Sequence, residues 1–139
     1  MAVLYTTKAS ATGGRTGRGA TEDGFLDVTL TRPKELGGDG ARGTNPEQLF
    51  GVGYAACFLS ALQLVASKQK VKIPDDARVT ATVGLKTRED GGYGIDVTLA
   101  VHVPNMDRAE LEPLVAKAHQ VCPYSYALRT SYEVPITIV

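Results

Sequence analysis

The chain has 139 residues, of which 43% are hydrophobic and 22% are charged, and its 15 Lys and Arg balance its 15 Asp and Glu. This length and composition predict one soluble domain spanning residues 1–139. A net charge of zero leaves no basic surface of the kind that a nucleic-acid partner requires. The N-terminus lacks the pattern of a secretory signal, and polar residues and glycines interrupt the apolar stretch 48–67. We therefore expect a cytoplasmic protein with neither a membrane span nor a nucleic-acid partner.

The first third of the chain has the pattern of short strands separated by glycine turns. Residues 3–12 and 24–30 alternate and are rich in Val, Tyr and Thr, which predicts strands. Residues 15–20 contain two arginines among glycines and fit either a strand or a turn. Residues 31–44 concentrate Pro, Gly and charge, which is typical of a loop.

A long helix is predicted from Pro46 to about Lys68. Asn45 can cap its first free N–H groups, Pro46 suits the first helical position, and Glu47 complements the positive end of the helix dipole. Apolar side chains occur on every face of this helix, so we expect it to be buried all round. A chain of this size covers such a helix poorly by itself, which predicts a homodimer.

The last two thirds of the chain complete an α+β order of elements. Residues 77–88 and 93–103 alternate on either side of Glu-Asp-Gly-Gly and predict a hairpin. Helices follow at 105–121 and directly after Cys122, and residues 132–139 have the pattern of a closing strand. This order is α+β rather than a regular βαβ alternation.

Two cysteines, Cys57 and Cys122, are the most prominent candidates for chemistry. In a reducing compartment, a bond between them would be transient or catalytic rather than structural. Cys57 in the middle of an apolar helix also fits a small, inert core residue. Cys122 directly before Pro123 is predicted to cap a helix, where a thiolate is favoured and is a good leaving group. A helix-start cysteine without any role is the alternative there.

Arg15, Arg18 and Glu47 are the charged residues that could assist a thiol. Glycines flank both arginines and give their backbone freedom to approach a buried site, where a guanidinium stays charged. Either arginine could therefore stabilise a thiolate, although a solvated surface pair is the alternative. Glu47 could equally be only a favourable charge in the first turn of its helix.

Metal, nucleotide and serine-hydrolase chemistry find little support. His102 and His119 can be written with the two cysteines as a zinc set, but the spacing lacks any short paired motif. The nucleotide-binding glycine motifs and the Gly-x-Ser-x-Gly motif do not occur. We expect neither a bound metal nor a bound cofactor.

Five short segments together carry a family resemblance that covers essentially the whole chain. They are residues 11–15 (ATGGR), 35–38 (ELGG), 44–50 (TNPEQLF), 53–58 (GYAACF) and 118–125 (AHQVCPYS). In this order they resemble the organic hydroperoxide resistance branch of the OsmC-like family. The fold that this resemblance implies has strands wrapped around a long central helix in an intertwined homodimer.

The resemblance also implies a thiol-dependent peroxidase and assigns its residues. Cys57 matches the peroxidatic cysteine, Cys122 the resolving cysteine, Arg15 the arginine that faces the thiolate, and Glu47 the carboxylate partner of that arginine. The implied cycle passes through a Cys57 sulfenic acid and a Cys57–Cys122 disulfide. An external dithiol, such as the dihydrolipoyl group of a lipoylated protein, then reduces that disulfide.

Apolar side chains of the long helix suggest the class of substrate. Walls made by Leu49, Phe50 and Phe58 would favour organic or fatty-acid hydroperoxides, because an apolar tail gains from leaving water. A competing interpretation is a dimeric redox sensor or lipid-binding domain. Turnover with a dithiol separates these possibilities, since a sensor oxidises once and a peroxidase cycles.

Overall fold

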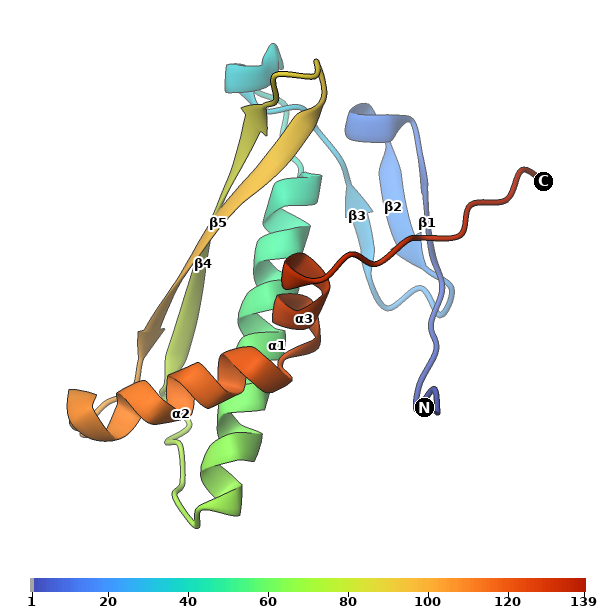
Figure 1. Cartoon of the computed structure of the whole chain (residues 1–139). Coiled ribbons are helices and arrows are strands. Elements are labelled where there is room, and N and C mark those ends of the chain that lie inside the picture. The colour runs from blue at the N-terminus through green and yellow to red at the C-terminus, as the bar shows by residue number, and fades with distance from the viewer. Residues whose placement is uncertain (1) are drawn as a thin grey trace. The chain divides into compact units, whose positions relative to one another are not determined.

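The computed structural model describes residues 2–139, which fall into two units with the boundary between Leu49 and Phe50. We call them the N-terminal unit and the C-terminal unit. The N-terminal unit contains a three-stranded sheet, and the C-terminal unit contains a two-stranded hairpin and most of the helical residues (Figure 1). The chain is thus an α+β protein, as the order of its elements predicts.

The sheet of the N-terminal unit is antiparallel, with the strand order β1-β2-β3. Its strands are β1 (Ala9–Thr12), β2 (Arg18–Thr21) and β3 (Asp27–Thr29). A short 3-10 turn, η1 (Gly14–Thr16), joins β1 to β2 and carries Arg15. Gly17 ends this turn, and a Cβ there would lie 1.8 Å from the Thr12 carbonyl oxygen. Only glycine therefore allows the chain to turn this tightly.

Two strand predictions in this unit were too long. The predicted strand 3–12 contains a strand only from Ala9, because β1 pairs with β2 from Ala9↔Thr21 to Thr12↔Arg18 and, within residues 2–139, no strand is paired with residues 3–8. The predicted strand 24–30 is reduced to β3, because Gly24 has a φ of 72° in the preceding turn. The ambiguous segment 15–20 is both a turn and a strand. The predicted loop 31–44 is confirmed apart from one 3-10 turn, η2 (Lys34–Leu36).

Helix α1 (Pro46–Lys68) has the predicted bounds. The Asn45 side chain accepts a hydrogen bond from the Gln48 N–H at 2.8 Å, which is the expected cap. The helix ends where Lys70 adopts a left-handed φ of 59° and the Val71 N–H bonds the Ala66 carbonyl oxygen.

Burial of α1 is one-sided in the single chain, so one chain alone does not bury the helix all round. Tyr54, Phe58, Leu62 and Val65 are among its buried residues, whereas Val52 and Leu64 are 72% and 52% exposed. An exposed stripe runs along the helix through Val52, Ala56, Ser60, Gln63, Leu64 and Ser67. The chain by itself therefore covers only one side of α1.

By length and composition alone, α1 would suffice to cross a membrane, since an 18-residue window reaches a mean hydropathy of 1.8. In the structure, however, its buried side supplies the centre of the C-terminal unit's core. Core helices of soluble proteins share this composition.

The hairpin of the C-terminal unit consists of β4 (Arg78–Thr87) and β5 (Tyr93–His102), close to the predicted bounds. Its inward positions alternate as predicted, with Val79 opposite Val101 and Val83 opposite Val97. The hairpin runs beside α1, and helix α2 (Arg108–Val121) lies across the lower half of both (Figure 1). Their shared core includes Tyr54, Phe58, Leu62, Val65, Val79, Val103, Leu114, Ala118 and Cys122.

Two further predictions near the C-terminus differ from the structure. Helix α2 begins at Arg108 rather than Asn105, because Asn105 has a left-handed φ of 60°. The predicted strand 132–139 is not a strand in the single chain, and its side chains are exposed, including Ile136 and Ile138. A strand needs a partner for its backbone groups, and none of the strands found among residues 2–139 pairs with this segment.

Candidate active site

Two free thiols meet in the C-terminal unit. Cys57 lies in the fourth turn of α1, and Cys122 lies between α2 and helix α3 (Pro123–Arg129). Their Sγ atoms are 3.6 Å apart although 65 residues separate them in the sequence. A disulfide requires an S–S distance of about 2.05 Å, so the pair is reduced here and stands a short movement from bonding.

Cys122 caps α3, as its position before Pro123 predicts. Pro123 occupies the first helical position, and the Cys122 carbonyl oxygen accepts the Tyr126 N–H at 2.9 Å. The Cys122 N–H in turn bonds the Ala118 carbonyl oxygen at the end of α2. The side chain of Cys122 is fully buried, so its thiol faces the core and Cys57 rather than solvent.

The surroundings of Cys57 disfavour its thiolate. Burial is the largest influence and raises the pKa of Cys57, and the adjacent Cys122 sulfur raises it further. A hydrogen bond from the Tyr124 backbone N–H acts in the opposite direction and lowers this pKa. The net pKa lies above its ordinary value, so a reactive thiolate at Cys57 requires additional positive charge.

Arg15 and Glu47 form a bidentate ion pair within the N-terminal unit. The two terminal guanidinium nitrogens of Arg15 donate to the two carboxylate oxygens of Glu47 at 2.8 Å and 2.6 Å. The side chains are 28% and 17% exposed. The hydrogen bond from Arg15 lowers the pKa of Glu47, and burial opposes this effect only in part. The pair holds the guanidinium in one plane and leaves its other edge free to donate.

Arg18, on β2, forms a different ion pair, with Asp27 on β3. Its guanidinium donates to both carboxylate oxygens of Asp27, and both side chains are well exposed. This pair matches the solvated surface alternative for Arg18. Arg15, on η1, is the arginine in a partly buried pair.

The candidate wall residues occupy different environments. Leu49 and Phe50 are half-buried, whereas Phe58 is 2% exposed and lies in the core. Phe50 belongs to an aromatic cluster with Tyr54 and Tyr124, whose ring centroids lie 5.8–6.0 Å apart. An apolar surface therefore lies on the part of α1 that precedes Cys57.

A polar network that no sequence motif indicated joins α1, α2 and α3 near the thiols. The Ser125 hydroxyl lies 2.8 Å from the Tyr54 hydroxyl and 2.9 Å from His119 Nδ1. A polar side chain at Ser125, three residues after the capping cysteine, was the one available signal. His119 was considered only as a metal ligand. Across residues 2–139, however, no three His, Cys, Asp or Glu side chains gather as a metal site would require.

Comparison with known proteins gives consistent matches over the whole chain. A family model described as OsmC-like protein matches residues 37–137. The organic hydroperoxide resistance protein of Xanthomonas axonopodis pv. citri is 53% identical over 136 residues, covering 98% of this chain and 95% of that protein. The Bacillus subtilis organic hydroperoxide resistance protein OhrB is 43% identical, covering 97% of this chain and 98% of that protein.

Solved structures of organic hydroperoxide resistance proteins have a similar fold. The crystal structure of Bacillus subtilis OhrB matches with a TM-score of 0.84 and 45% identity, covering 91% of this chain and 93% of that chain. The crystal structure of an organic hydroperoxide resistance protein from Elizabethkingia anophelis matches with a TM-score of 0.87 and 46% identity, covering 93% of this chain and 91% of that chain.

Proposed function

Since the chain belongs to the OsmC-like protein family and resembles organic hydroperoxide resistance proteins over its whole length, we propose that it is a thiol-dependent peroxidase. Its substrates are organic hydroperoxides, including those of fatty acids, and its products are alcohols. The observation that carries this proposal is the pair of free thiols, Cys57 and Cys122, with sulfurs 3.6 Å apart. The family model spans the boundary between the two units, which supports one functional domain over residues 1–139.

The reaction begins at Cys57, the more exposed of the two thiols. Its thiolate attacks the O–O bond of the hydroperoxide, which leaves a sulfenic acid on Cys57 and releases the alcohol after protonation. The Cys122 sulfur then attacks the Cys57 sulfur, and the hydroxyl group departs with the thiol proton as water. An external dithiol reduces the resulting disulfide and is itself oxidised to a disulfide.

Arg15 and Glu47 have supporting roles in this proposal. The guanidinium of Arg15 offsets the desolvation that raises the pKa of Cys57, and Glu47 orients it through the bidentate pair. Glu47 and Cys57 are ten residues apart on α1, about 15 Å along an ideal helix, so they do not act through direct contact. Either subunit of a dimer could supply the pair.

The apolar surface near Cys57 supports a preference for organic substrates. Leu49 and Phe50 are the candidate walls for an apolar tail, whereas Phe58 is buried in the core and is less suited to contact a substrate. Hydrogen peroxide has no such tail, so cumene hydroperoxide is expected to be reduced faster.

A homodimer and a cytoplasmic location complete the proposal. The exposed stripe of α1 and the exposed apolar ends of the chain, at residues 3–5 and 134–139, support a second copy as their cover. The reductant is a dithiol such as the dihydrolipoyl group of a lipoylated protein, regenerated by a dihydrolipoamide dehydrogenase. The cycle needs no bound cofactor and no metal.

The test is a single oxidation of the reduced protein. One equivalent of tert-butyl hydroperoxide is added, and free thiols and intact mass are followed within seconds. We expect loss of both thiols and a mass lower by two hydrogens. The Cys122→Ser variant should accumulate a sulfenic acid, and Cys57→Ser should not react. Unchanged thiols in the wild type would contradict the proposal and favour a binding protein.

A further inference from the structure

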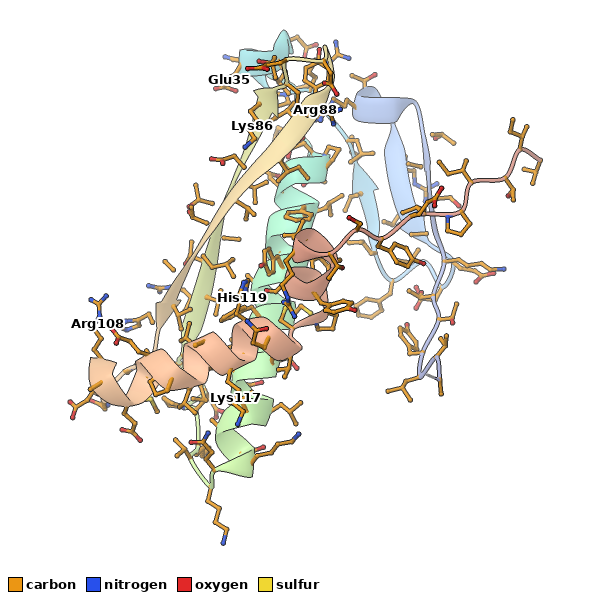
Figure 2. The ribbon with its side chains drawn as sticks, viewed as in Figure 1. Glu35, Lys86, Arg88, Arg108, Lys117 and His119 are labelled. Carbon is orange, nitrogen blue, oxygen red and sulfur yellow. The ribbon has the colours of Figure 1, made fainter. Side chains whose placement is uncertain are left out.

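A hydrogen-bonded network of two buried hydroxyl groups and one exposed imidazole joins the three helices of the C-terminal unit. Tyr54 lies on α1, His119 on α2 and Ser125 on α3. Ser125 is fully buried and Tyr54 is 4% exposed, so neither hydroxyl has water as a ready alternative partner. Figure 2 labels His119 near the end of α2 that leads into α3. We call these three residues the hydroxyl clamp.

The clamp is satisfied whichever nitrogen of His119 carries the proton. A hydroxyl donates one hydrogen bond and accepts others, so Ser125 can donate to Nδ1 while accepting from Tyr54, or the reverse. A buried hydroxyl left without its partner is unfavourable, because it has given up its hydrogen bonds to water and gained none in the protein. The two hydrogen bonds of the clamp therefore stabilise the packing of α1, α2 and α3 seen here.

The end of α3 that the clamp holds is the end that contacts Cys57. Cys122, the residue that caps α3, places its sulfur 3.6 Å from that of Cys57. Helix α3 has only seven residues, too few to be stable without tertiary contacts. Its far end is separately fixed, because Arg129 donates to the carbonyl oxygens of His119 and Gln120.

We propose that Tyr54, Ser125 and His119 are positioning residues that hold the Cys122 sulfur within reach of Cys57, and thereby set the rate of disulfide closure. This inference rests on the proposed function, in which closure follows the sulfenic acid. Closure forms the S–S bond, breaks the S–O bond of the Cys57 sulfenic acid, and releases water that carries the Cys122 thiol proton. Shortening the S–S distance from 3.6 Å is a small movement only while α3 keeps its place.

The experiment separates closure from the first oxidation. The rate of the first oxidation is proportional to the peroxide concentration. Disulfide closure is intramolecular, so its rate does not depend on that concentration. Rapid mixing with excess tert-butyl hydroperoxide, acid quenching and intact mass resolve the reduced, sulfenic and disulfide forms. The variants are Tyr54→Phe, Ser125→Ala, His119→Leu and His119→Asn, with Thr98→Ala as a control that also removes a hydroxyl. Thr98 lies at an exposed position of β5.

We expect Tyr54→Phe, Ser125→Ala and His119→Leu to slow closure by about tenfold or more, because small displacements of reacting atoms have effects of this size. His119→Asn retains a polar group near the position of Nδ1 and should restore much of the rate. Thr98→Ala should close as fast as the wild type. The proposal would be overturned if Tyr54→Phe and Ser125→Ala both closed the disulfide at the wild-type rate while circular dichroism showed that their helical fold was retained.

A parallel arm with diamide keeps this test independent of peroxide chemistry. Diamide adds to one thiol, and the second thiol displaces it, giving the disulfide and the reduced hydrazine. If peroxide leaves the wild-type thiols unchanged while diamide closes the disulfide, the proposed function fails. The clamp is then judged by the diamide closure rates of the same variants, with the same expected slowing and the same contradicting outcome.

Discussion

At the scale of single residues, Glu47 has two electrostatic partners. It lies in the first turn of α1, where a negative charge complements the helix dipole, and it accepts both hydrogen bonds of the bidentate pair with Arg15. The first partner is predictable from the sequence, because Asn45 and Pro46 mark the start of the helix. The second lies 32 residues away, and only the family resemblance pointed to it.

Glu47→Gln should weaken both stability and the proposed reaction. The folded pKa of Glu47 lies below its ordinary value, so its contribution to stability is present above that value and is lost as pH falls through the lowered one. Urea unfolding at a series of acidic pH values should therefore show a shallower loss of stability in the variant. The first oxidation step should slow by about tenfold, because Arg15 is no longer held in one plane.

Asp27→Asn is the matched control for that prediction. It removes the carboxylate from the exposed ion pair between Arg18 on β2 and Asp27 on β3. Solvent screening leaves such a pair with little stabilising effect. Its first oxidation step should match that of the wild type. An equal loss in both variants would show that a general charge effect, rather than the orientation of Arg15, governs the step.

At the scale of elements, local signals determined what the sequence could predict. The bounds of α1 were predicted because Asn45 caps the helix at one end and the apolar pattern ends near Lys68 at the other. The hairpin was predicted for similar reasons, since Glu-Asp-Gly-Gly separates two alternating runs. The segment 132–139 alternates equally well, yet a strand also needs a partner, which its own residues do not specify.

The candidate site likewise has one feature that a local sequence signal predicts and one that only tertiary packing determines. The cap at Cys122 follows from the adjacent Pro123, a local signal. The clamp joins Tyr54 to Ser125 across 71 residues, and no spacing rule relates two residues that far apart. Their contact depends on how α3 packs against α1, which tertiary structure alone decides.

The end of α1 allows a test of element stability. Lys70 adopts a left-handed conformation that glycine adopts without strain. Lys70→Gly should therefore raise the free energy of unfolding by up to about 1 kcal/mol, measured by urea denaturation. Lys68→Gly, placed inside the last helical turn, should lower it by about the same amount. A loss of stability in both variants would contradict this account of the helix end.

At the scale of the whole molecule, the apolar surface of the single chain is the main feature. Val52 is 72% exposed on the same helix that forms the core, and Ile136 is 86% exposed near the chain's end. Single exposed apolar residues are ordinary, but apolar residues that recur along one exposed face of a helix, as Val52, Ala56 and Leu64 do, indicate an interaction surface. The proposed homodimer is the simplest cover for it.

Val52→Glu should weaken that homodimer, since it places an unpaired charge in an apolar contact. Light scattering at micromolar concentration should give about twice the 14.7 kDa chain mass for the wild type and a value nearer one chain for the variant. Lys117→Glu changes charge on an exposed position of α2 and should leave the mass unchanged. A wild-type mass of one chain would contradict the proposed homodimer.

The unequal burial of the two sulfurs gives the proposed disulfide a direction. Cys122 is fully buried, whereas Cys57 is partly exposed. An incoming dithiol can approach only the Cys57 end of the bond, so the mixed disulfide forms there and Cys122 departs as the leaving thiol. The hydroperoxide and the dithiol thus reach the same sulfur, that of Cys57, one after the other. The buried sulfur of Cys122 is shielded from both.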